Sequence, residues 1–297
     1  MQSFDPSLLT RTKGRLVKSA IFGKISKILP AWLRHAIRAS NALTAFNCPN
    51  IIGRFHCNDD MLDSFSSKDV RDYLKSGLCA LTNIEDSLAT AGRSFSDVRS
   101  CLDIPCGYGR VLRWLQVRMD RSLITACDLN REGVDFCERE FGTNPLYSRQ
   151  NLCELVFPNK YDLIWVGSLL THLEVETAIA FLHVLMEPLL PSGLIVFTTH
   201  GESCLYTPGI AFFYSGMPIA NSREELAELE DKLMLQFSLD RFCYAPYSRG
   251  GSYGNTIHHR SFIEELMGKQ FSRQLRLVRF REQGWDGLQD VWTYQKH

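Results

Sequence analysis

The chain has 297 residues and the composition of a globular protein. Hydrophobic residues make up 45% of the sequence and charged residues 22%, which excludes a disordered chain and a coiled coil. No apolar run approaches the roughly 18 residues that a membrane-spanning helix needs, so no such helix is predicted. The ten cysteines include no C-x-x-C pair, which predicts neither a disulfide framework nor a zinc site and favours a cytosolic protein.

The formal net charge of zero hides a division of the chain. Residues 1–58 contain nine lysines and arginines and one acid, a net charge of +8, and the rest of the chain carries −8. An enzyme that acts on nucleic acid would carry positive charge around its site. The rest of the chain, which we call the body, shows no such positive charge, so no nucleic-acid partner is predicted. Within residues 11–40, apolar side chains recur near helical spacing with cations between them. We interpret this basic arm as a peripheral membrane contact, a surface that packs on the body or a partner subunit, or a mitochondrial presequence.

The rest of the chain predicts helices followed by alternating strands and helices. Two helices are expected within 59–98, where they would brace the domain. Strands are predicted over 101–104, 123–128, 161–167 and 194–199, with helices over 110–118, 132–141 and 175–186. Such an alternation indicates a parallel sheet covered on both faces. The chain ends in a predicted β-hairpin, with strands over 275–281 and 290–295 and a turn over 282–289.

Acids and glycines follow the first two predicted strands. Asp103 ends the first strand and is followed by a tight turn with Gly107 and Gly109, while Asp128 ends the second. Ligands of a doubly wound sheet bind at the carboxyl ends of its strands, and glycines there let the backbone approach a ligand closely. The dinucleotide fingerprint needs a third glycine where this chain has Leu112. A cationic cofactor without a phosphate is therefore favoured, with Asp128 accepting the hydroxyls of a ribose.

These segments resemble the class I S-adenosylmethionine-dependent methyltransferases over roughly residues 99 to 200. The resemblance implies a Rossmann-like, doubly wound seven-stranded sheet with an antiparallel last strand, and S-adenosylmethionine as the cofactor. It implies cofactor contacts from Asp103, Pro105, Cys106, Gly107 and Gly109 at the first turn, Asp128 and Leu129 after the second strand, Asn151 and Leu152 before the strand 161–167, and Gly167 at its exit. Two positions depart from the family pattern, because Pro105 stands in place of a glycine and Asn151 in place of an acid.

A narrower resemblance concerns the acceptor. The stretches LDIPCGYGR, GSLLTHL, FTTHG and GWDGLQDV are similar to those of bacterial methyltransferases associated with glycosyltransferases and surface-glycan assembly. This implies methyl transfer to an oxygen of a saccharide or glycan-linked acceptor, beside a glycosyltransferase partner at the inner membrane surface. The alternatives are a small-molecule or natural-product O- or N-methyltransferase, and a non-catalytic scaffold that keeps the fold.

The domain plan follows from these segments. Residues 1–58 form the basic arm, and residues 59–297 form the methyltransferase domain. Within the domain we expect a helical brace over 59–98, a cofactor-binding core over 99–200, a lid over 201–259, and a C-terminal helix and hairpin over 260–297. The lid is too long for a plain connection and contains a predicted helix over 222–235.

The candidate catalytic groups are two histidines after strand ends. Methyl transfer is an in-line displacement that needs no metal, and a hydroxyl acceptor needs a base for its proton. His200 and His172 are the candidate bases, although His172 also fits a structural role in capping backbone groups. The candidate substrate contacts are Glu202, Tyr244, Tyr247, Trp285 and Asp286. The lid aromatics suit stacking on a sugar ring and also suit ordinary packing. Two adjacent histidines, His258 and His259, point in different directions and lack a third ligand, so no metal site is predicted there.

Overall fold

A computed structural model of the chain describes residues 51, 54–62, 66–206, 223–247 and 253–297. The chain divides into two compact units, Met1–Lys75 and Ser76–His297. The boundary between them falls inside a helix, so the predicted boundary at residue 58 stays a prediction. Residues 11–40, for which we predicted a membrane or subunit contact, lie outside the described residues. In the part of the chain that the structure describes, no helix is long and apolar enough to cross a membrane.

The predicted helical brace is one helix, α3, which spans Ser67–Thr90. At its start, the Ser66 amide donates to the Asp69 carboxylate at 3.2 Å, and the Asp69 amide donates to the Ser66 hydroxyl at 3.1 Å. This reciprocal pair is a capping box. The prediction of two helices over 59–98 is wrong. Gly77 lies inside this helix, and a Cβ there would be 2.2 Å from the Arg110 carbonyl oxygen, so glycine permits the close packing of the helix on the segment that follows β1.

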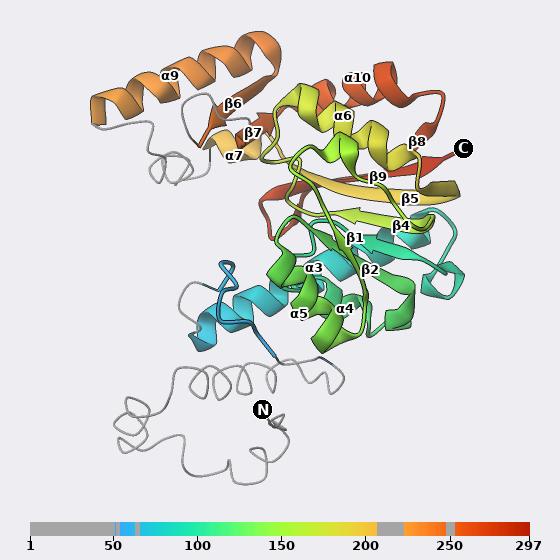
Figure 1. Cartoon of the computed structure of the whole chain (residues 1–297). Helices are drawn as coiled ribbons and strands as arrows, with labels where there is room; N and C mark the ends of the chain where they lie inside the picture. The colour runs from blue at the N-terminus through green and yellow to red at the C-terminus, as the bar shows by residue number, and fades with distance from the viewer. Residues whose placement is uncertain (1–50, 52–53, 63–65, 207–222, 248–252) are drawn as a thin grey trace, which may run out of the picture. The chain divides into compact units, whose positions relative to one another are not determined.

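The main sheet has seven strands in the order β3-β2-β1-β4-β5-β9-β8 (Figure 1). Their bounds are β1 Cys101–Asp103, β2 Ile124–Asp128, β3 Asn144–Tyr147, β4 Tyr161–Val166, β5 Leu189–His200, β8 Leu275–Trp285 and β9 Gln289–Lys296. Strands β1 to β5 are parallel, and β9 pairs antiparallel with β5. The predicted seven-stranded Rossmann-like sheet with an antiparallel last strand is confirmed. Strand order reverses beside β1, which places a ligand site at the carboxyl ends of β1 and its neighbours.

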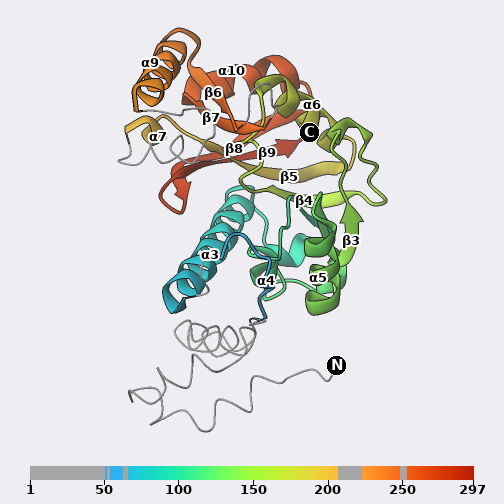
Figure 2. The ribbon, with the colours of Figure 1, turned by 60° about the vertical axis from the view of Figure 1, so that its left-hand side comes forward.

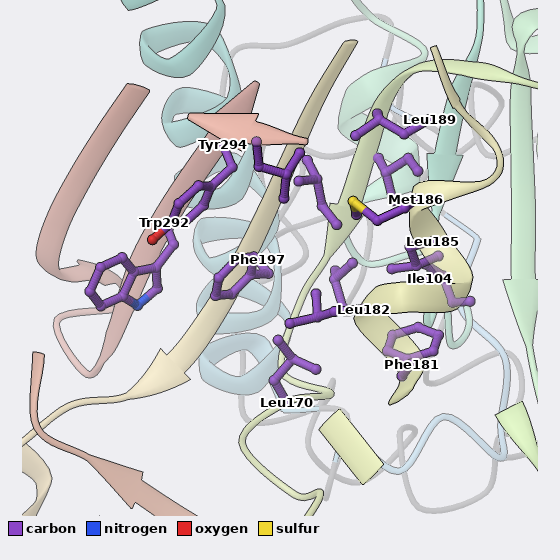
Figure 3. Packing of buried hydrophobic residues seen from close by; sticks show 14 of the residues in the cluster. Ile104, Leu170, Phe181, Leu182, Leu185, Met186, Leu189, Phe197, Trp292 and Tyr294 are labelled. Carbon is purple, nitrogen blue, oxygen red and sulfur yellow. The ribbon is translucent and has the colours of Figure 1, made fainter. Parts of the chain in front are cut away.

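Helices cover both faces of this sheet. On one face, α6 (Val175–Met186) and α10 (Arg260–Phe271) enclose the main apolar core. Figure 3 shows Phe181 and Leu182 of α6 in this cluster with Phe197 of β5 and Tyr294 of β9. The Phe197 and Tyr294 rings are stacked with centroids 5.8 Å apart. On the opposite face lies α3 (Figure 2), whose Ser87 hydroxyl is hydrogen-bonded to that of Thr293 at 2.6 Å.

The segment after β5 builds a second, two-stranded sheet. It contains α7 (Ser203–Tyr206), α9 (Arg223–Asp240), β6 (Phe242–Pro246) and β7 (Gly254–His258), and β6 and β7 are antiparallel. Strand β7 is attached to the loop after β4, because the Gly254 amide donates to the His172 carbonyl and the Thr256 amide to the Thr171 carbonyl, each at 2.9 Å. An isolated parallel bridge also joins His258 to Gly201 after β5. Strand β7 of the predicted lid therefore lies at the carboxyl ends of β4 and β5.

Several element boundaries differ from the prediction. Strand β5 begins at Leu189, five residues before the predicted start at residue 194, and β8 continues to Trp285 with an irregular register after Arg281. The helix expected over 110–118 is the short α4 (Leu112–Leu115), whereas α5 (Arg131–Phe141) and α6 lie where expected. The helix predicted over 222–235 corresponds to α9, which continues to Asp240, and residue 222 lies outside the described residues. The edge strand β3 and the pair β6 and β7 were not predicted.

Candidate active site

The turn after β1 carries the predicted acid and glycines. Gly107 and Gly109 have φ values of +51° and +82°, a region that favours glycine. The peptide bond before Pro105 is cis. A Cβ on Gly109 would lie 2.3 Å from the ring of Phe141, whereas one on Gly107 would meet nothing within 4 Å. The two glycines therefore have different roles in the structure. Gly109 permits close packing on Phe141, and Gly107 leaves open space beside the turn.

Asp103 is a buried carboxyl group without a hydrogen-bond partner. Its side chain is 1% exposed, and neither carboxyl oxygen is hydrogen-bonded within the described part of the chain. Burial, and secondarily the negative charge of Asp128, raise its pKa well above the ordinary value, while Arg110 opposes the shift. An unpartnered buried acid is costly unless a cationic partner is present. This carboxyl group fits a cofactor that carries positive charge.

Asp128, at the end of β2, links the second strand to the glycine turn. Its Oδ2 accepts a hydrogen bond from the Gly107 amide at 2.7 Å, and its Oδ1 accepts one from the Asn130 amide at 2.8 Å. Asn130 in turn caps α5 through the Gly133 amide. The next residue, Leu129, is 54% exposed. The predicted pair therefore presents an oriented carboxylate beside an open apolar surface, as a ribose and a flat base require.

The remaining predicted cofactor residues have different surroundings. Asn151 is exposed and donates to Glu154 at 2.9 Å, and Leu152 is half-buried against the main core. Gly167 is buried and packs closely on Trp165, because a Cβ at this position would lie 2.6 Å from the indole nitrogen. A side-chain hydrogen bond with Cys137, followed by burial, raises the pKa of the Cys106 thiol well above its ordinary value, so Cys106 is a packing group in its protonated form.

His172 is held by the lid strand. Its Nδ1 lies 2.9 Å from the Gly254 carbonyl oxygen and 2.8 Å from the Tyr247 hydroxyl, which donates to Asn255 Oδ1 at 2.9 Å. Burial lowers the pKa of His172 below 6.5, so the ring is neutral at pH 7. The rings of Tyr247 and Tyr253 lie 5.7 and 5.2 Å from the His172 ring. The structure thus brings together a predicted base and a predicted substrate contact, Tyr247.

The other histidines have different environments. His200 is 3% exposed, its Nδ1 lies 3.2 Å from the Thr256 carbonyl oxygen, and burial together with His172 lowers its pKa to about 3. His258 is buried, and its Nδ1 has no hydrogen-bond partner among the described residues. His259 caps α10 through Nδ1, and its Nε2 lies 3.4 Å from the Glu202 carboxylate. His200 is therefore far less accessible than His172, and Glu202 is placed beside His259.

Trp285 and Asp286 lie beside α3 and Arg110. The Trp285 indole nitrogen donates to the Ser76 carbonyl at 2.9 Å, and the Asp286 carboxylate accepts from the Ser76 hydroxyl at 2.5 Å. The guanidinium of Arg110 stacks on the Trp285 ring, 4.9 Å from its centroid. These two predicted substrate residues thus contact α3 and the glycine turn. Tyr244 lies on β6, where burial raises its pKa to about 12.

The sequence analysis missed a polar cluster between β4, β5 and β9. The Ser168 amide donates to the Thr198 hydroxyl at 2.8 Å, that hydroxyl donates to Gln289 Oε1 at 2.6 Å, and Gln289 Nε2 donates to the Ser168 hydroxyl at 3.0 Å. Ser168 has a φ of +59°. No local motif marks this cluster, because its members come from three separate segments. Arg110 was also missed, although its place directly after Gly109 was a usable signal.

The known proteins that resemble this chain include several methyltransferases. Residues 101–193 match the family model of a methyltransferase domain. An S-adenosylmethionine-dependent methyltransferase of Clostridium acetobutylicum ATCC 824 is 14% identical, with a TM-score of 0.47, over 75% of this chain and 91% of its own. The plantazolicin methyltransferase BamL, solved with S-adenosylhomocysteine (SAH) and a triazolic desmethylPZN analog, is 15% identical, with a TM-score of 0.48. The match covers 89% of this chain and 97% of that one. The magnesium protoporphyrin IX methyltransferase of Synechocystis PCC 6803, solved with SAH, is 15% identical, with a TM-score of 0.48, and the match covers 88% of this chain and 98% of that one. No curated protein matches the chain.

Three observations point to the same kind of domain. They are the strand order, the acid and glycine turn after β1, and the match to the family model of a methyltransferase domain. The unpartnered Asp103 fits the positive charge of S-adenosylmethionine, and the oriented Asp128 fits its ribose. Residues 101–193 are therefore similar to a methyltransferase domain, and the sheet has the strand order that the resemblance to the class I methyltransferases implies.

Proposed function

We propose that this protein transfers a methyl group to a hydroxyl oxygen of a small acceptor, with a saccharide as the first candidate, and that His172 is the base. S-adenosylmethionine supplies an electrophilic methyl group on a sulfonium. The observation that carries the proposal is the contact of His172 Nδ1 with the Gly254 carbonyl oxygen at 2.9 Å. A carbonyl oxygen only accepts hydrogen bonds, so Nδ1 carries the proton and Nε2 keeps its lone pair.

The hydrogen bonds around His172 agree with this tautomer. Burial raises the pKa of Tyr247 to about 12, so its hydroxyl stays protonated and donates to Asn255 Oδ1. A lone pair of the same hydroxyl then faces the proton on His172 Nδ1, 2.8 Å from the nitrogen. The ring is thereby held in one orientation. A neutral imidazole with a free Nε2 can take the proton of an acceptor hydroxyl as the oxygen is methylated.

The aromatic rings beside this base support the acceptor class that we propose. Tyr247 and Tyr253 lie 5.5 Å apart and both pack on His172, and Tyr253 is 50% exposed. Aromatic faces with hydroxyls at their rims suit a sugar ring, which has apolar faces and polar edges. A flat phenolic natural product would stack on the same rings, and it is the second candidate acceptor.

A methyl-transfer assay tests this proposal. Formation of SAH would be measured with nucleotide sugars and simple glycosides in one panel and with phenols in another. His172→Gln, which keeps a polar side chain without a base, should lose about 100-fold or more of the turnover. His183→Gln is the matched control, because His183 is an exposed histidine on α6 that packs on Phe271. Unchanged turnover in His172→Gln would refute the role of His172.

The pH dependence gives a second test. Because burial places the pKa of His172 below 6.5, the base is already deprotonated at pH 7. The rate should therefore be level between pH 7 and 8 and fall as the pH drops through a value below 6.5. A phenol acceptor that ionises by itself would show a rate that keeps rising above pH 8. A chain that binds SAH but methylates neither panel would favour the scaffold alternative.

A further inference from the structure

A chain of hydrogen bonds fixes the side chain of Ser168, which follows β4. Thr198 Oγ1 accepts from the Ser168 amide at 2.8 Å and lies 2.6 Å from Gln289 Oε1, a length typical of an O–H donor. Gln289 Nε2 lies 3.0 Å from Ser168 Oγ, a length typical of an N–H donor. The side-chain amide of Gln289 is thereby held in one orientation, with its nitrogen toward Ser168.

This orientation leaves the hydroxyl proton of Ser168 available. The hydroxyl oxygen accepts from Gln289, so its own proton is free to be donated in another direction. The Thr171 hydroxyl lies 3.5 Å away, too far for a good hydrogen bond between hydroxyls, and it already donates to the Ser168 carbonyl oxygen at 2.7 Å. Because Ser168 is only half-buried, its proton is within reach of a bound molecule.

The backbone of Ser168 is held in an unfavourable conformation. Its φ is +59°, a region that costs free energy for a residue with a Cβ. The hydrogen bonds of its amide to Thr198 and of its carbonyl oxygen to Thr171 hold it there. Strained residues of this kind persist where their surroundings fix them, and they cluster at ligand sites. The strain therefore points to a side chain that is placed for a ligand.

The same contacts bring Ser168 to the region of the proposed base. Gln289, which donates to Ser168, is the register partner of His200, so the side chains of Gln289 and His200 lie on one face of the sheet. The His200 ring lies 6.2 Å from the His172 ring. Ser168 and His172 also belong to one turn, in which the His172 amide donates to the Leu169 carbonyl at 3.0 Å. The hydroxyl donor and the base therefore lie in one region at the carboxyl ends of β4 and β5.

We propose that Ser168 donates a hydrogen bond to a second oxygen of the acceptor, next to the hydroxyl group whose proton His172 takes up. This inference rests on the proposed methyl transfer to oxygen and narrows the acceptor to compounds with two neighbouring oxygens, because only four residues of one turn separate the donor from the base. A vicinal diol has this pattern, in a sugar and in a catechol alike. Gln289 and Thr198 are then positioning residues, because they direct the Ser168 proton toward the acceptor.

Acceptors that differ by one oxygen test this inference. Formation of SAH would be measured with catechol and phenol, and with the best glycoside of the sugar panel and its singly deoxygenated analogues. For the wild-type protein, loss of the neighbouring oxygen should lower kcat/KM about 10- to 100-fold, as expected when a polar group of the site loses its partner. A preference seen in the sugar pair alone, or in the catechol pair alone, would identify the source of the diol.

Two variants test the role of the hydroxyl and of its orientation. Ser168→Gly removes the hydroxyl and should fold, because glycine suits the positive φ. It should lose the same 10- to 100-fold with the complete acceptor and little with the deoxygenated analogue, so that it no longer distinguishes the two. Gln289→Glu keeps Ser168 but replaces the amide donor by an acceptor, which takes up the Ser168 proton. This variant should also lose the preference, while both variants keep the fall in rate at low pH that we assign to His172.

Ser100→Ala is the matched control. Ser100 is a half-buried serine that precedes β1, and its hydroxyl donates to Asp162 of β4 at 3.2 Å, at the opposite ends of these strands. This variant should keep the preference for the diol. Equal kcat/KM of the wild-type protein for both members of each pair would overturn the inference and leave the proposed function standing, as would a preference that survives in Ser168→Gly. If the wild-type protein methylated none of these acceptors, the proposed function would fail and this inference with it.

Discussion

Replacing Gly107 and Gly109 by alanine, one at a time, separates the space kept for the cofactor from the space needed for packing. Both residues have positive φ, so alanine costs about 1–2 kcal/mol in each turn, partly offset by about 0.4–1 kcal/mol from the lower entropy of the unfolded chain. In Gly109→Ala the new Cβ would also lie 2.3 Å from the buried Phe141 ring, and displacing that ring costs about 1–3 kcal/mol more. We expect Gly109→Ala to lose roughly 2–4 kcal/mol of unfolding free energy, and Gly107→Ala about 1 kcal/mol.

Binding should show the opposite order. The Cβ of Gly107→Ala would occupy the open space beside the turn, where the backbone amide already donates to Asp128. Urea unfolding would measure stability, and calorimetric titration with SAH would measure affinity for each folded variant. Gly107→Ala should remain stable but bind SAH at least tenfold more weakly, a loss of about 1.4 kcal/mol. If Gly107→Ala bound SAH as the wild-type protein does, the cofactor would not approach this glycine and the assignment of the turn would be refuted.

Three further predictions concern stability. Burial lowers the pKa of His258 to about 4, so between pH 6.5 and 4 only the unfolded chain takes up this proton. The unfolding free energy should therefore fall by about 1.4 kcal/mol for each pH unit of acidification in this range. His258→Phe should reduce that slope when it is measured by urea unfolding at several pH values. Burial raises the pKa of Asp290 from 3.8 to about 6, so between these two pH values only the unfolded chain releases this proton, and the unfolding free energy falls as the pH rises. Asp290→Asn should therefore gain about 1–3 kcal/mol of unfolding free energy at pH 8 and little at pH 4, and equal gains at both pH values would contradict this cause. Ser87→Ala should cost about 1–3 kcal/mol by leaving the buried Thr293 hydroxyl without its partner, and a double-mutant cycle with Thr293→Val would measure the coupling.

The core of the sheet was predictable because its signals are local. Short apolar runs between amphipathic helices predict parallel strands, and α6 begins and ends at the predicted residues. The acid and glycine turn was recognisable because positive φ and a close backbone approach restrict the residue type at each position. Strand β3 was missed because it is a four-residue edge strand with a proline and little burial. Strands β6 and β7 were missed although β6 does alternate, with Cys243 and Ala245 buried on one face.

The sequence by itself determined the fold class, the glycine turn after β1 and the two acids that end β1 and β2. Only the tertiary structure decided which of these groups are partnered. Among the described residues it left Asp103 without a hydrogen bond, stacked Arg110 on Trp285, and placed His172 Nδ1 beside the Gly254 carbonyl oxygen. These contacts join residues that are far apart in the chain. Local periodicity reports which face of an element is buried, but the charge state and free donors of a group depend on neighbours brought by other segments.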